Sequence, residues 1–134
     1  MVKLVKSIYT GSDVTSLGEL SATDSIDQGI AGAITALTDA ATITPDLNAS
    51  NNFSVTLAGN RTLANPTNIT AGQSGSIFVT QDGTGSRTLA YGSYFKFAAG
   101  TAPTLSTVAA SVDRIDYVVA TTTKIHAVAS LDVK

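Results

Sequence analysis

His126 is the only histidine among the 134 residues, so any histidine-dependent catalysis must be built around this side chain. A serine nucleophile, with His126 as its base and Asp113 or Asp116 as the orienting carboxylate, would form a hydrolytic triad. His126 also alternates with apolar residues along 124–131, as an exposed polar side chain on a β-strand does. The alternation accounts for its position without a catalytic role, so we expect no catalytic residues.

The segment 82–87, Asp-Gly-Thr-Gly-Ser-Arg, could bind phosphate through its glycines. It lacks the Gly-Lys-Ser/Thr ending of a phosphate-binding loop, and the sequence predicts no helix after it. Asp-Gly between two β-type runs is instead typical of a tight turn, because both residues tolerate positive φ angles. We therefore predict a β-hairpin at this position.

The spacing of the acidic residues and the lack of cysteine predict neither a metal site nor a cofactor. Asp24, Asp27 and Asp39 are too widely spaced for a calcium-binding loop and lack its glycine and terminal glutamate. No carboxylate pair of the kind used by glycoside hydrolases can be recognised. The chain has no cysteine, which excludes disulfides and thiolate ligands for zinc.

Four aromatic residues form a candidate contact loop with two possible roles. They could be a platform for carbohydrate, or the edge of a strand-loop-strand unit packed into the core or against another subunit. Gly92 and Ser93 between them favour the packed arrangement, and both interpretations stay open. The loop consists of Tyr91, Tyr94, Phe95 and Phe97.

Charge and hydropathy exclude two classes of partner. The net charge is −2, and the eight basic residues are scattered, so we expect no binding to nucleic acid. No apolar run has the length of a signal peptide or a membrane span. We therefore expect synthesis in the cytoplasm and no membrane partner.

Short β-type runs separated by turn residues dominate from about residue 41 and predict an all-β fold. Their number and spacing indicate an antiparallel, jelly-roll-like β-sandwich over 41–134. Ile115, Tyr117 and Val119 alternate along one run whose other face is also partly apolar, which predicts a central strand. The eight expected strands are 41–47, 53–57, 61–63, 75–81, 87–91, 95–97, 114–121 and 124–131.

Residues 1–40 are expected to form an extended N-terminal arm, because their apolar residues are sparse and separated by glycines. Ile26, Ile30, Ile34 and Leu37 fall at helical spacing and predict a short helix within it. Such an arm would become ordered against a partner. The candidate attachment residues are Val14, Leu17, Leu20, Ile26, Ile30, Ile34 and Leu37.

Three blocks of the sequence together resemble a β-domain found in structural proteins of tailed phages. They begin at Asn52 (Asn-Phe-Ser-Val-Thr-Leu-Ala-Gly-Asn-Arg-Thr-Leu), at Ala71 (Ala-Gly-Gln-Ser-Gly-Ser-Ile-Phe-Val-Thr-Gln-Asp-Gly-Thr-Gly-Ser-Arg-Thr-Leu) and at Gly100 (Gly-Thr-Ala-Pro-Thr-Leu-Ser). The resemblance covers roughly residues 41–131 and implies a scaffold in a virion rather than chemistry. It also implies a homotrimer.

The short arm before the domain is similar to the build of a capsid decoration or head-fibre protein. We therefore expect a non-enzymatic virion protein that attaches to capsid or tail proteins of the assembled particle. The alternative is a tail-fibre or tail-tip module that binds a host-surface glycan. A glycan hydrolase is the third and least favoured interpretation.

Overall fold

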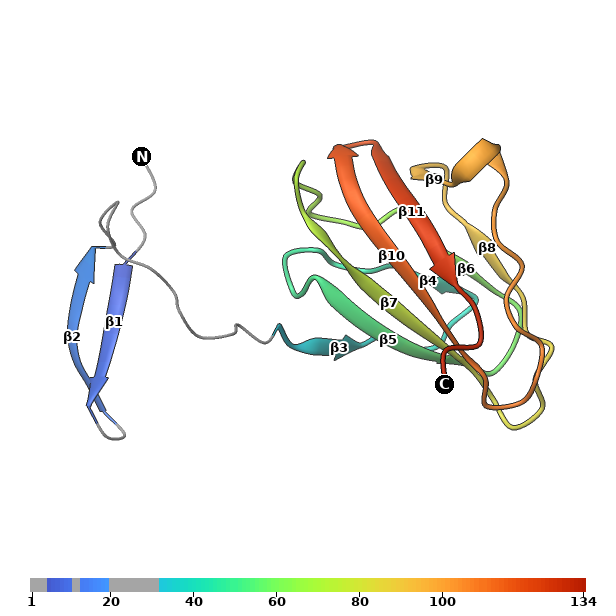
Figure 1. Cartoon of the computed structure of the whole chain (residues 1–134), viewed down its shortest axis with the longest axis horizontal. Helices are drawn as coiled ribbons and strands as arrows, with labels where there is room; N and C mark the ends of the chain where they lie inside the picture. The colour runs from blue at the N-terminus through green and yellow to red at the C-terminus, as the bar shows by residue number, and fades with distance from the viewer. Residues whose placement is uncertain (1–4, 11–12, 20–31) are drawn as a thin grey trace. The chain divides into compact units, whose positions relative to one another are not determined.

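The computed structural model describes residues 5–10, 13–19 and 32–134, and the chain divides into two compact units, 1–31 and 32–134 (Figure 1). In the first unit, β1 (Val5–Thr10) and β2 (Asp13–Glu19) pair as an antiparallel hairpin. The second unit is built from nine strands and one 3₁₀ turn, which confirms the all-β prediction. These are β3 (Ile34–Ala36), β4 (Thr42–Ile43), β5 (Asn52–Leu57), β6 (Arg61–Leu63), β7 (Ser74–Gln81), β8 (Leu89–Tyr91), β9 (Phe95–Lys96), η1 (Ala98–Gly100), β10 (Val112–Thr121) and β11 (Lys124–Ser130).

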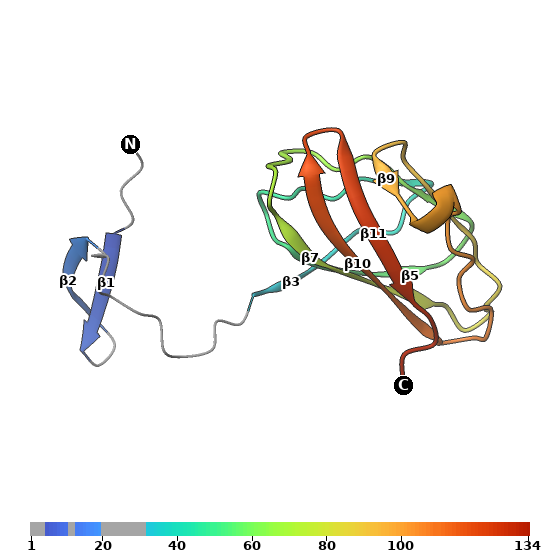
Figure 2. The same ribbon diagram turned by 45° about the horizontal axis from the view of Figure 1, so that its top comes forward.

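The second unit contains two sheets, whose larger one is labelled in Figure 2, and buried side chains from both form one hydrophobic core. The larger sheet has the strand order β3-β5-β7-β10-β11-β9, and the smaller sheet has the order β4-β6-β8. Phe53, Ile77 and Ile115 bury their side chains completely from the larger sheet, and Leu63 does so from the smaller one. Every second residue of β10 from Asp113 to Val119 is buried, and this strand lies between β7 and β11, as predicted for a central strand.

The strand directions differ from the antiparallel, jelly-roll-like arrangement that the sequence suggested. From β3 to β8 the chain alternates between the two sheets, and each strand runs parallel to its neighbour in the same sheet. The chain thus winds through three coils, and the antiparallel pairs of this unit are β7–β10 and β10–β11. The prediction was wrong because inward–outward alternation along a strand carries no information about the direction of its neighbour.

Asparagine side chains help to hold successive coils together. The Oδ1 atoms of Asn52, Asn60 and Asn65 each accept a backbone N–H from the following coil, at 3.2, 3.1 and 2.8 Å. These side chains satisfy backbone groups where the ladders of parallel strands begin or end. The many asparagines of this region therefore have a structural role.

The segment 82–87 is a turn, as predicted, but it does not form a hairpin. It joins β7 and β8, which belong to different sheets. Asp82 Oδ1 accepts the N–H groups of Thr84 and Gly85 at 3.0 and 2.9 Å, and its Oδ2 accepts the Arg87 guanidinium Nη2 at 2.8 Å. The local residue pattern identified the turn correctly, whereas the sheet that the next strand joins depends on distant packing.

The described part of the predicted arm also differs from expectation. Residues 34–36 form β3, an edge strand parallel to β5, and are therefore not helical. The rest of the expected helix, from Ile26 to residue 31, lies outside the described residues. Backbone pairing with β5, which the helical spacing of the isoleucines could not reveal, determines the structure of residues 34–36.

Candidate functional site

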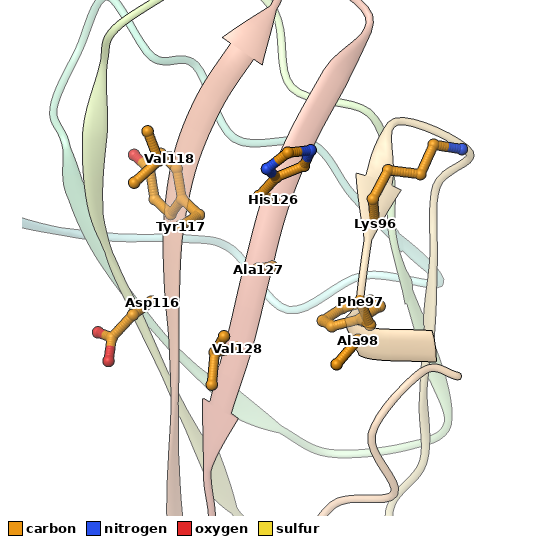
Figure 3. A pocket seen from close by; sticks show the side chains of 9 residues that line it. All are labelled: Lys96, Phe97, Ala98, Asp116, Tyr117, Val118, His126, Ala127 and Val128. Carbon is orange, nitrogen blue, oxygen red and sulfur yellow. The ribbon is translucent and has the colours of Figure 1, made fainter. Parts of the chain in front are cut away.

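A groove of about 550 Å³ lies where β10, β11 and the end of β9 meet (Figure 3). β9 pairs with β11 at two positions only, Phe95 with Ile125 and Lys96 with His126. Beyond this short strand the chain turns into η1. β9 therefore does not pair with the rest of β11, and a hollow remains beside that part of β11. We call this hollow the β11 groove, and its lining residues are Lys96, Phe97, Ala98, Asp116, Tyr117, Val118, His126, Ala127 and Val128.

Strand register explains which side chains reach the groove. His126 pairs with Val118 of β10 on one side and with Lys96 of β9 on the other. Because Ile125 and Ala127 point into the core, the residues between and beside them point outward. Val118 and Val128 are 52% and 64% exposed, so they present apolar surface to solvent. The groove therefore combines an apolar surface with two basic side chains.

The acidic residue of the groove already has partners. The Asp116 carboxylate accepts the Ser76 hydroxyl at 2.6 Å and the Arg114 guanidinium Nη2 at 2.9 Å. Its negative charge is therefore offset within the sheet. Lys96 Nζ donates to the Ser93 carbonyl oxygen at 2.7 Å, which is a neutral partner. An ammonium group has three donors, so this contact leaves donors available to another molecule.

Of the two carboxylates considered for a triad with His126, Asp116 lines the same groove, whereas Asp113 is separated from His126 by the sheet. Asp113 is 1% exposed and faces the core, where its oxygens accept the Ser106 N–H and hydroxyl, each at 2.7 Å. It also accepts the Asp132 N–H at 2.8 Å. His126 faces outward, so these two side chains lie on opposite faces of one sheet. Among the described residues, no three His, Asp or Glu side chains gather in a way that could hold a metal ion.

The predicted contact loop is packed largely against itself and the core. The Tyr91 ring meets the Phe97 ring edge-to-face with centroids 4.7 Å apart, and it contacts Phe95 in the same manner at 6.0 Å. Burial, together with the charge of Asp113, raises the pKa of the Tyr91 phenol. Tyr94 also packs against the core cluster. Only Phe97 of the four borders the β11 groove, and both roles considered for the loop stay predictions.

Sequence reasoning missed most of the β11 groove. Only its separate elements could be recognised, namely the alternation of His126 with apolar residues and the aromatic loop. Val118, Val128 and Lys96 come together through the register of three strands, two of them parallel. One signal was present: Val128 stands on the otherwise polar face of its strand.

A family model described as putative phage tail fibre C-terminal domain matches residues 43–128. The matched range runs from β4 into β11 and contains all of the β11 groove. The chain belongs to this family. The tail fibre domain is therefore a structural component of a phage virion, as the resemblance implied. The match favours the tail-fibre interpretation over that of a capsid decoration protein.

The comparisons of this chain with curated proteins and with solved structures found no match. In the described part of the chain, no helix has the length and apolar character needed to cross a membrane.

The expected attachment residues of the tail fibre domain occupy different settings. Val14 and Leu17 belong to β2, and Leu20, Ile26 and Ile30 lie outside the described residues. Ile34 is 57% exposed on β3, whereas Leu37 packs against the core. Leu37 therefore contributes to the second unit itself, and an attachment role for the others stays a prediction.

Proposed function

We propose that this tail fibre domain is a non-enzymatic binding module that contacts a glycan on the host surface. The observation that supports it is the β11 groove, which places apolar and basic side chains on a rigid sheet. Saccharides present apolar C–H faces together with polar rims, and binding sites commonly combine an apolar lining with a few polar groups. The groove has both kinds of surface.

A binding role without turnover fits the positions of the chain's titratable groups. Hydrolysis of a glycan ordinarily needs two carboxylates on either side of the scissile bond. Asp116 is the one carboxylate that lines the groove, and it is engaged by Arg114 and Ser76. A panel of host polysaccharides incubated with the domain should therefore release no reducing ends, and release abolished by His126→Ala would contradict this part of the proposal.

Binding can be tested with the purified full-length chain and host cells. We expect retention on untreated cells and loss of retention after periodate oxidation of surface sugars. Val128→Glu places a charge in the groove at a position 64% exposed, so it should reduce retention without affecting folding. Val108→Glu is the matched control, because Val108 is 69% exposed and does not line the groove. Equal retention of both variants would exclude the groove as the contact surface.

We further propose that the domain works as a homotrimer within the fibre. Only 13% of its residues are charged, so most of its surface carries no charge that a contact between copies would have to desolvate. A face with little uncompensated charge can approach another copy at low desolvation cost. Sedimentation equilibrium should give three times the chain mass at micromolar concentration, and a monomer throughout that range would remove the proposal.

A further inference from the structure

We propose that the β11 groove binds an anionic group carried on a saccharide, and that Lys96 and His126 hold this group. The inference rests on the proposed function, because it names the chemistry of the ligand that the same groove would take. A carboxylate and a phosphate both present the required negative oxygens. The shared chemistry is the proposal, and the experiment below distinguishes the two sources.

The two basic side chains are placed together by strand pairing. Lys96 and His126 are register partners in the parallel pair of β9 and β11, and both are exposed on the outer face. Figure 3 shows them from neighbouring strands at one end of the groove, with Val128 further along β11. The Lys96 ammonium points away from His126 towards the Ser93 carbonyl oxygen, so Lys96 has to leave this contact and change rotamer for a single anionic group to accept hydrogen bonds from both side chains.

Among the residues that the structure describes, Lys96 has no carboxylate partner, unlike most cations of the second unit. Within residues 32–134, four basic side chains form ion pairs with aspartates 2.5–2.9 Å away. The acidic residue nearest along the groove, Asp116, is occupied by one of them, so it does not compensate Lys96. The charge of the groove is therefore complementary to an anion. The paired residues are Arg61, Arg87, Arg114 and Lys134.

The remainder of the groove favours a saccharide over a free ion. Ala98, Val118 and Val128 provide aliphatic surface beside the basic pair, and a bare anion would gain nothing from it. A sugar ring that carries the anion can lay its C–H face on this surface. The volume of about 550 Å³ is ample for one or two sugar rings.

The test uses the full chain and the imidazole resonances of His126, which are unique because the chain has one histidine. The probes are methyl glucuronide, glucose 6-phosphate, neutral methyl glucoside, and acetate at matched ionic strength. We expect saturable shifts with one or both anionic sugars, and at least about threefold weaker binding of methyl glucoside and acetate. Saturation by glucuronide alone would assign a carboxylate, and by the phosphate sugar alone a phosphate. Equal responses to all four probes, or no saturable response, would overturn the proposal.

Paired variants test whether the contact is local. Lys96→Gln should weaken binding of the anionic sugar about three- to tenfold while leaving the neutral sugar unchanged. Lys124→Gln is the matched control, since Lys124 is an exposed lysine on β11, the strand of His126, but does not line the groove. Equal losses from both variants would indicate general electrostatic attraction and would contradict the assignment.

Retention on host cells separates this inference from the proposed function. If cells retain the wild-type chain and Lys96→Gln equally well, the domain binds the host but the anionic site is wrong. If cells retain neither chain while His126 still responds to the anionic sugar, the site is correct and the host-binding function fails.

Discussion

The side-chain amide of Gln81 hydrogen-bonds both backbone groups of Arg87. Gln81 Nε2 donates to the Arg87 carbonyl oxygen at 2.9 Å, and Oε1 accepts the Arg87 N–H at 2.8 Å. The amide thereby takes the place of a strand neighbour and fixes the chain as it leaves one sheet for the other. Gln81 is 2% exposed, so water cannot substitute for it.

Gln81→Leu should lower the free energy of unfolding by about 2–4 kcal/mol, because it leaves the N–H and carbonyl of Arg87 without partners. Urea unfolding followed by circular dichroism measures this loss. Thr122→Ala in the exposed β10–β11 turn is the control and should change stability by less than about 0.5 kcal/mol. If Gln81→Leu loses no more stability than the control, the hydrogen bonds between Gln81 and Arg87 do not stabilise the fold.

Two glycines with positive φ allow the cost of backbone strain on substitution to be distinguished from the cost of a steric clash. Gly85 has φ +75°, and an added Cβ would lie 2.5 Å from the Thr107 carbonyl oxygen. Gly72 has φ +91°, with nothing within 4 Å of an added Cβ. Gly72→Ala should therefore cost about 1 kcal/mol from conformation alone. Gly85→Ala should cost at least about 2 kcal/mol more, since backbone must move. Thermal unfolding of both variants compares them, and equal losses would contradict the predicted clash.

Stability should fall as the solution becomes acidic, and Asp82 should contribute to this loss. Hydrogen bonds from Arg87, and then from the Gly85 and Thr84 N–H groups, lower the pKa of Asp82 from 3.8 to about 2. Because the folded-state pKa lies below the unfolded one, the stabilisation is complete above about pH 4 and is lost towards pH 2. Urea midpoints measured across this interval should decline, and less steeply for Asp82→Asn. An identical slope for this variant would exclude a contribution from Asp82.

Truncation should locate the start of the stable fold. Removing residues 1–31 should leave a cooperative melt but abolish most binding to phage particles, since the expected attachment residues are largely lost. Removing residues 1–40 should also lower the melting temperature, because it deletes β3, Leu37 and the Asp39 carboxylate. Asp39 accepts Arg61 Nε and Nη2 at 2.8 and 2.6 Å. Equal melting temperatures for the two truncations would show that residues 32–40 do not contribute to the fold.

The sequence predicted the strands well because each strand carries its own signal. The observed β5, β7 and β11 begin and end within one residue of the expected runs, and buried residues alternate along them. Local turn chemistry likewise identified the turn at 82–87. Strand direction and sheet membership depend on contacts between distant residues, so the parallel coils could not be recognised.

The candidate site was harder to predict for the same reason. His126 was correctly expected on the exposed face of its strand, but Lys96 and Val118 become its neighbours only through sheet register. The aromatic residues were chosen by type, and three of them pack against one another. A groove between strands is a property of pairing, which no single segment encodes.

The parallel winding also determines where this domain can change during evolution. Ile34 pairs with Asn52, and Asn52 pairs with Ser76 one coil later. The second coil, from Asn52 to Ser76, therefore contains more residues than the first, from Ile34 to Asn52, although both keep the parallel strand register. Several of the residues between β6 and β7, including Thr67, Thr70 and Gly72, are exposed at the bend between sheets. Insertions at such bends leave the register of the coils intact. A lineage can therefore lengthen and diversify the rims of this domain while its core stays unchanged.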